Sequence, residues 1–224
     1  MNVFYRPKVP LRGAVADDGA VYTIRGDVTF EAVRVDATTG AEAVVLPLPR
    51  DEEGFSVAVN RDSVFVAACP NIFTSVRPTD DQATACEIRM APKSGRGTAN
   101  VLRGQMGTAT YMRADDTTLY FTDATNGIVG RVSLADRKTT VLARDQNHPS
   151  SLDVDAEHVF FTSGGKLMSV SKDAAGPVKR LDEMCIRDSF SSACRSTGER
   201  RAHQATRRAS VPRSDVSARW RRAD

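Results

Sequence analysis

The chain has 224 residues, of which 41% are hydrophobic and 26% charged, and its formal net charge at pH 7 is +3. No run of apolar residues is long enough to cross a bilayer, so we predict no membrane span. Residues 1–183 carry 21 Lys and Arg against 24 Asp and Glu, whereas residues 184–224 carry 10 Arg against 4 acidic residues. The basic character therefore belongs to the C-terminal segment alone.

Four stretches of the chain share one pattern: a strand of small apolar residues, an Asp or Asn, and a strand with aromatic residues. Their turn residues stand 43, 55 and 40 positions apart. A repeat of about 40–45 residues built from short strands is typical of a β-propeller. We therefore predict an all-β propeller of four-stranded antiparallel blades, with about four blades present. The four turn residues are Asp17, Asn60, Asp115 and Asp155.

Each repeat continues with a Gly- or Asp-containing turn, a third strand, a polar turn and a short fourth strand. No segment shows an apolar period of 3.6 residues over helical length, so no helix is predicted. Residues 1–12 are expected to form an N-terminal strand or a partial blade. The four blades are expected at residues 13–50, 54–104, 107–144 and 149–182.

The third repeat carries a family resemblance. It reads Leu-Tyr-Phe-Thr-Asp at residues 119–123, Gly-Ile-Val-Gly-Arg-Val at 127–132 and Val-Leu at 141–142, and then Pro-Ser-Ser-Leu-Asp-Val-Asp at 149–155. This order resembles the YWTD and NHL class of six-bladed propellers. The resemblance covers about residues 13–182 and implies six blades, so we expect this chain to be truncated from a longer propeller.

The C-terminal segment has a different character. Residues 183–189 read Glu-Met-Cys-Ile-Arg-Asp-Ser, which resembles the translation of a transposon end used to tag sequencing libraries. From Phe190 onward there are nine Arg but no Lys, Leu or Ile. We expect residues 183–224 to be an artefactual or disordered basic tail. The alternative is an arm that binds nucleic acid, and we favour the first interpretation and predict no nucleic-acid partner.

The segment Asp145-Gln146-Asn147-His148-Pro149 connects two blades just before an inner strand. Loops of this kind gather around the axis of a propeller, where ligands bind. A His next to Asn and Asp can act as an acid–base catalyst or a metal ligand. Asn147 and His148 are therefore candidate ligand-binding residues, and His148 is the one candidate catalyst. The alternative is an ordinary solvated loop.

Arg113 and Asp153 occupy equivalent places on consecutive inner strands, where Val15 and Ala58 stand in the first two repeats. A charge within a strand is costly to bury without a partner. We expect a salt bridge that faces the central channel. The alternative is that each of the two side chains binds a polar ligand there.

Cys69 and Cys86 bracket an insertion in the second repeat. A disulfide between them would close this loop and would indicate an oxidising compartment, and hence an exported protein. Two separately buried thiols are the alternative.

The favoured function is a non-catalytic binding scaffold, bacterial and exported, that presents inter-blade loops to a protein or polymer ligand. The first alternative is a lactonase-like hydrolase or lyase with a His or a metal, Ca²⁺ or another divalent ion, at the central channel. Asn147, His148 and Asp153 would belong to that site. The second alternative is an incomplete gene fragment with no function of its own. The sequence specifies no other cofactor.

Overall fold

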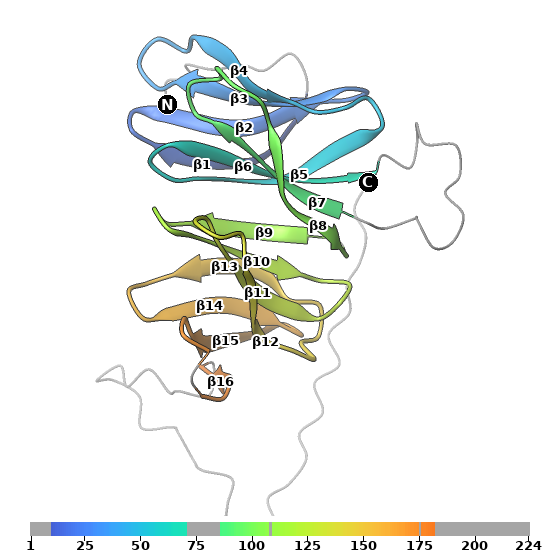
Figure 1. The fold of residues 1–224 in the computed structure, drawn as a ribbon, viewed down its shortest axis with the longest axis vertical. Helices are drawn as coiled ribbons and strands as arrows, with labels where there is room; N and C mark the ends of the chain where they lie inside the picture. Colours follow the sequence, from blue (N-terminus) through green and yellow to red (C-terminus); the bar gives the residue numbers. More distant parts are fainter. Residues whose placement is uncertain (1–9, 71–85, 108, 175, 182–224) are drawn as a thin grey trace, which may run out of the picture. The chain divides into compact units, whose positions relative to one another are not determined.

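The computed structural model describes residues 10–70, 86–107, 109–174 and 176–181. Within these residues it contains sixteen strands in four antiparallel sheets of four strands each, and no helix (Figure 1). The predicted fold class is confirmed. The four sheets belong to one compact unit, Met1–Met184. The described part of the chain also contains no helix with the length and hydrophobicity to cross a bilayer.

Each sheet is a meander in which strands consecutive in the chain are neighbours. The first sheet contains β1 (Leu11–Asp17), β2 (Ala20–Gly26), β3 (Phe30–Asp36) and β4 (Glu42–Pro47), and the second contains β5 (Glu52–Val59), β6 (Ser63–Pro70), β7 (Cys86–Pro92) and β8 (Asn100–Met106). The third contains β9 (Ala109–Ala114), β10 (Thr118–Asp123), β11 (Ile128–Ser133) and β12 (Thr139–Ala143), and the fourth contains β13 (Ser150–Val154), β14 (His158–Ser163), β15 (Lys166–Ser171) and β16 (Lys179–Arg180).

The first sheet begins earlier than the repeat pattern indicated. Leu11 and Arg12 pair with β2 and so belong to the first sheet, not to a separate N-terminal element. The pattern is interrupted at Gly13, where the register shifts and φ is +59°, a backbone conformation that glycine adopts without strain. The expectations for residues 1–9 and 183–224 lie outside the described residues.

The first hairpin of three sheets is closed by the Asp or Asn that the sequence indicated. Asp115 Oδ1 accepts hydrogen bonds from the backbone N–H groups of Thr117, at 3.0 Å, and Thr118, at 2.8 Å. Asn60 and Asp155 accept the same two bonds from the residues two and three positions further on. These side chains therefore build the turns that lead into the second strands.

The first sheet makes this turn differently. Asp18 and Gly19 both have positive φ angles, +45° and +67°, as in the two-residue turns that join tightly paired antiparallel strands. Asp17 pairs with Ala20 at the end of the ladder, and its carboxylate binds Lys93 of the second sheet. The role expected for Asp17 as a turn acceptor is therefore replaced by a contact between sheets.

Consecutive sheets pack face to face, with their first strands β1, β5, β9 and β13 side by side in that order. Three buried clusters fill the spaces between the sheets, the first around Ile24, the second around Phe65 and Phe121, and the third around Phe161. Tyr120 and Phe121 are neighbours in β10 but belong to different clusters, because alternate residues of a strand face opposite sides. This explains the consecutive apolar residues of the second strands.

A lysine joins the third and fourth sheets. Lys172 follows β15, and its Nζ lies 3.7 Å from Asp115 Oδ2 and 4.8 Å from the centre of the Tyr120 ring. The first interface contains the same three residue types in equivalent places, namely Lys93, Asp17 and Tyr22. In two of the three interfaces, a lysine at this place thus makes both an ion pair and a cation–π contact.

The second interface uses an apolar version of this contact. Leu134 occupies the place of Lys93 and Lys172, because in all three the backbone N–H donates to the carbonyl just before the second strand. Leu134 packs against the cluster that contains Phe65, which stands where the other interfaces have Tyr. Asn60 replaces the Asp, and its Nδ2 donates to the Asp115 carbonyl at 3.2 Å. Lys thus occurs with Tyr and Asp, and Leu occurs with Phe and Asn.

Candidate functional site

The four residues singled out by the sequence lie in two separate hollows. Arg113 and Asp153 line one of about 320 Å³ beside the first strands of the third and fourth sheets. Asn147 and His148 line one of about 350 Å³ formed by their own loop and the turn at residues 124–127. The two hollows share no lining residue. The structure therefore does not bring the four residues together in one site.

Arg113 and Asp153 form an ion pair across β9 and β13, with Arg113 Nε 3.4 Å from Asp153 Oδ1. The two side chains keep 44% and 78% of their surface exposed. An exposed pair of this kind contributes only about 0–1 kcal/mol to stability. Val15 and Ala58, at the equivalent places, pack into the apolar clusters. The charges of Arg113 and Asp153 are thus held at the surface, where a ligand can reach them.

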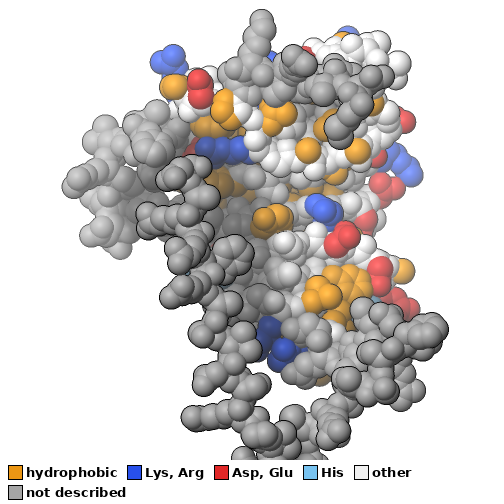
Figure 2. All heavy atoms as spheres, turned by 180° about the vertical axis from the view of Figure 1, so that it is seen from behind, with side chains coloured by type: hydrophobic (Ala, Val, Ile, Leu, Met, Phe, Trp, Pro, Cys, Tyr) orange, Lys and Arg blue, Asp and Glu red, His pale blue; other side chains and the backbone are white. Residues whose placement is uncertain are grey.

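Apolar side chains extend this hollow beyond the ion pair. Tyr111 and Leu167 are each 44% exposed, and Phe160 lies beside them while Leu152 and Phe161 are buried beneath. We call this surface, lined by residues 111, 113, 151–153, 160–162 and 167, the inner groove. Figure 2 shows hydrophobic side chains gathered next to acidic ones in the lower half of the view, where the third and fourth sheets lie. The inner groove therefore combines an aromatic surface with both signs of charge.

The apolar part of the inner groove was not predicted from the sequence, although Tyr111 is an unusual residue for its place in the repeat. The equivalent residues of the other three repeats are small, namely Gly13, Ser56 and Ser151. One large aromatic residue in a place otherwise kept small is a sign of a local role. Phe160 gave no comparable sign, because its equivalents are the aromatic residues of the interfaces between sheets.

The loop that carries Asn147 follows a backbone pattern found one repeat earlier. The Asn147 N–H donates to Ser163 Oγ at 3.0 Å, and the Gly107 N–H donates to Asp123 Oδ2 at 3.0 Å in the equivalent place. A Cβ on Gly107 would meet Asp123 at 2.5 Å, whereas Asn147 fits because Gly164 opposite it has no side chain. The side chain of Asn147 is thus accommodated because Gly164 has none.

His148 is exposed and has a positive φ of +46°. Its imidazole makes no hydrogen bond to any of the described residues, whereas a catalytic base is usually oriented by a partner. Within the described part of the chain, no three His, Cys, Asp or Glu side chains are arranged to hold a metal ion. The structure thus shows His148 as an exposed imidazole without a hydrogen-bonding partner among the described residues.

Cys69 and Cys86 are joined by a disulfide, with their Cα atoms 4.1 Å apart. Both are buried in the cluster between the second and third sheets, at the ends of β6 and β7. The bond joins the two strands where the chain leaves and re-enters the sheet. The insertion between them, residues 71–85, lies outside the described residues.

Comparison with known proteins gives a match at the level of structure only. No family model and no curated protein matches the chain. A chain of a nidogen/laminin complex superposes with a TM-score of 0.61 at 18% identity, over 80% of this chain and 67% of that one. The fold is that of a β-propeller. Sequence identity this low shows the fold alone.

Two oligogalacturonate lyases also match. One, solved in complex with manganese, has a TM-score of 0.54 at 14% identity and matches 74% of this chain. The other, from Vibrio parahaemolyticus, has a TM-score of 0.53 at 9% identity and matches 72%. The matched region spans 50% of each lyase chain. Propellers with very different functions therefore share the stacking of sheets seen in this one.

Proposed function

We propose that this chain is a binding propeller that presents the inner groove to a peptide segment of a protein ligand. The observation that carries the proposal is the meeting of Tyr111 and the exposed Arg113–Asp153 pair, on β9 and β13, with Leu167 of β15 in one hollow. Tyr and Arg are enriched among the residues that dominate protein interfaces. Side chains of this kind contribute most to the binding free energy when a partner buries them.

The chemistry of the inner groove favours a particular kind of peptide. An apolar side chain would cover Tyr111 and Leu167, removing their exposed surface from water at about 25 cal/mol per Å². A neighbouring charged group would pair with Arg113 or Asp153. Among the strands that the structure describes, β9 and β13 each have a partner strand on one side only, and this edge can offer main-chain hydrogen bonds to a peptide.

The same proposal includes an exported protein. The disulfide between Cys69 and Cys86 supports it, because such bonds persist in oxidising compartments. A protein ligand is compatible with the match to a chain of a protein complex. The lyase-like alternative is less well supported, because Asn147 and His148 line a different hollow from Asp153.

The test is a selection of random dodecapeptides displayed on phage, followed by affinity measurement with the enriched synthetic peptides. Tyr111→Ser and Arg113→Ala install the residues of the second repeat at these places, so both variants should fold. We expect each to weaken binding about tenfold, or about 1.4 kcal/mol, because each removes a contact made by the inner groove.

Val44→Ser is the matched control for this experiment, since Val44 is similarly exposed, at 41%, on the first sheet. It should leave the dissociation constant unchanged. The proposal is wrong if the enriched peptides bind the Tyr111 and Arg113 variants as tightly as they bind the original chain. A selection that enriches no peptide also contradicts it.

A further inference from the structure

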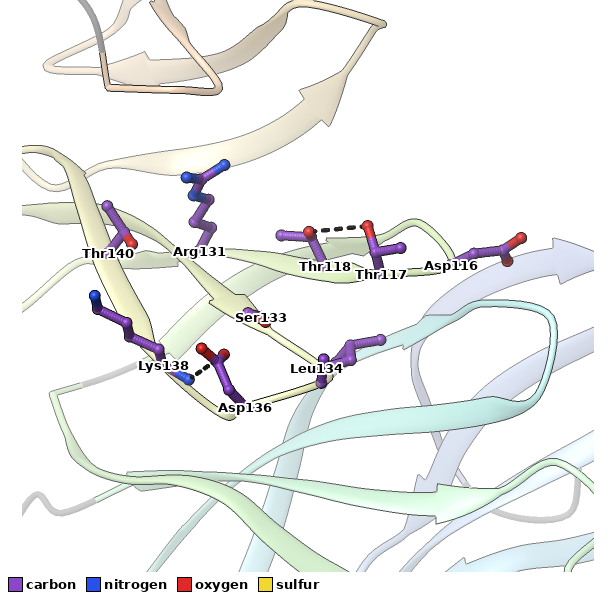
Figure 3. A pocket seen from close by; sticks show the side chains of 10 residues that line it. Asp116, Thr117, Thr118, Arg131, Ser133, Leu134, Asp136, Lys138 and Thr140 are labelled. Atoms are coloured by element: carbon purple, nitrogen blue, oxygen red, sulfur yellow. Dashed lines mark hydrogen bonds between the residues drawn. The ribbon is translucent and has the colours of Figure 1, made fainter.

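A larger hollow, of about 660 Å³, lies on the third sheet, away from the inner groove. It is formed by the start of β10, by β11, by β12 and by the turn that joins β11 to β12 (Figure 3). Most of its lining side chains are polar, and they include Thr118, Arg131, Ser133, Asp136, Lys138 and Thr140.

Comparison with the first sheet shows that Arg131 lacks the partner that its counterpart has. Arg34 and Arg131 occupy the same place, each in a third strand and opposite the Tyr of the second strand. Arg34 Nη2 lies 3.9 Å from the carboxylate of Asp36. The residue in the place of Asp36 is Ser133 in the third sheet. Arg131 accordingly forms no ion pair with any described residue, although arginine side chains in proteins are cationic.

Lys138 brings a second positive charge to this hollow. Figure 3 shows Arg131 and Lys138 extending on the same side of the sheet, with Thr140 between them. Asp136, which also lines the hollow, accepts hydrogen bonds from the Ser133 hydroxyl and the Lys138 backbone N–H, which lower the pKa of Asp136. It is thus ionised and bound within its own turn.

The other carboxylate of the hollow is already paired. Asp116 Oδ2 lies 3.1 Å from Arg61 Nη2, a residue of the neighbouring sheet. Asp136 offsets one of the two positive charges of Arg131 and Lys138. One positive charge remains in excess, and no described residue accepts a hydrogen bond from the Arg131 guanidinium.

We infer that this hollow binds a carboxylate group of a ligand, with Arg131 as the main contact. A guanidinium matches a carboxylate with two parallel N–H···O bonds, which neither a hydroxyl nor a lysine can provide. Thr140 lies directly opposite Arg131 on the neighbouring strand and offers a hydroxyl donor to the same group. The volume admits more than one carboxylate, so a small polycarboxylate or an acidic peptide side chain fits.

The test is a titration of the full chain followed by NMR, using citrate in one arm and hexaglutamate in the other. We expect the largest shifts at the Arg131 Nε–H and at the amides of residues 116–118 and 131–140. Binding should weaken with added salt, because it is electrostatic. Tighter binding of citrate assigns the site to a small molecule, and tighter binding of hexaglutamate assigns it to a peptide.

Two variants isolate the contact. Arg131→Gln should weaken binding at least about tenfold, the usual scale for one lost charge-assisted bond. Thr140→Glu keeps the arginine but places a carboxylate on its cross-strand neighbour, and should abolish binding. Circular dichroism of both variants checks that the fold is kept.

Arg34→Gln is the matched control, since Arg34 already faces Asp36, and it should not change the affinity. Tyr111→Ser should likewise leave carboxylate binding unchanged, which separates this site from the inner groove. The inference is overturned by shifts confined to other parts of the chain, by an equal loss in the Arg34 and Arg131 variants, or by the absence of any shift.

Discussion

Asp115 uses its two carboxylate oxygens for different contacts. Oδ1 closes the hairpin by accepting the N–H groups of Thr117 and Thr118, and Oδ2 faces Lys172 and the hydroxyl of Tyr120, at 3.7 Å and 3.3 Å. Burial alone raises the pKa of Asp115, but the hydrogen bonds from Thr117 and Thr118 and the charge of Lys172 outweigh burial and lower it. One side chain thus stabilises both a turn and an interface.

Substitutions of Asp115 should separate these two roles. Asp115→Asn should keep the turn, as Asn60 does in the second sheet, and lose the ion pair with Lys172 and the bond accepted from the Tyr120 hydroxyl, at a cost of about 1 kcal/mol. Asp115→Ala should lose both, and the unsatisfied backbone N–H groups bring the cost to about 1–3 kcal/mol. Urea unfolding monitored by circular dichroism measures both. Equal losses in the two variants would contradict the assignment of roles.

The pH dependence gives an independent check of Asp115. Because its pKa is lowered by folding, the ionised carboxylate stabilises the native state above the ordinary Asp pKa of about 3.9. That contribution is lost as the pH falls through the lower pKa of the folded state. The difference in unfolding free energy between the original chain and Asp115→Asn should therefore shrink below about pH 4. A difference that stays constant from pH 7 to pH 2.5 would contradict the argument.

Single residues differ in how far the sequence reveals their roles. The turn residues were recognisable because they recur at one place in every repeat. Arg113 and Asp153 were recognisable as charges at places otherwise apolar. Asn147 was interpreted as a candidate ligand-binding residue, and the sequence did not show that its side chain fits against Gly164, a residue of another turn that only the fold brings near.

At the scale of elements, the interfaces between sheets come in two versions. Lys172 with Tyr120 and Asp115 forms the polar version, and Leu134 with Phe65 and Asn60 forms the apolar one. The three members change together, because a lysine needs the carboxylate and favours the electron-rich ring, whereas a leucine needs neither. The sequence contains this covariation, but it becomes visible only when residues are grouped by interface rather than by repeat.

When the polar version is exchanged for the apolar one, the effects of the single substitutions on the unfolding free energy should be strongly non-additive. Lys172→Leu alone should destabilise the chain by about 1–3 kcal/mol, because it leaves the half-buried carboxylate of Asp115 without its cation. Adding Tyr120→Phe and Asp115→Asn should restore much of that loss. Unfolding free energies of the single, double and triple variants test this prediction. The prediction is wrong if the triple variant loses as much unfolding free energy as the three single variants lose in total.

At the scale of the whole molecule, the stacking of sheets follows directly from the repeat. A sheet that is apolar on both faces needs a neighbour on each side, so a chain of such sheets builds a propeller. The inner groove could not be predicted in this way. It arises where Tyr111 and Arg113 of one sheet meet residues of the next, and no local pattern records that meeting.

The four sheets and their three clusters all lie within the unit Met1–Met184. A chain that ends at Met184 should therefore unfold cooperatively and at the same temperature as the full chain, within about 1 °C. Thermal unfolding followed by circular dichroism compares the two. A drop of several degrees, about 1 kcal/mol for a domain of this size, would show that residues 185–224 stabilise the fold.

We propose the inner groove as the binding surface of this propeller. The most direct test is hydrogen–deuterium exchange of the full chain, with and without a peptide selected for binding. The peptide should slow exchange in β9, residues 109–114, and in β13, residues 150–154. Slowed exchange confined to the loop at residues 144–149, or to the first two sheets, would contradict it.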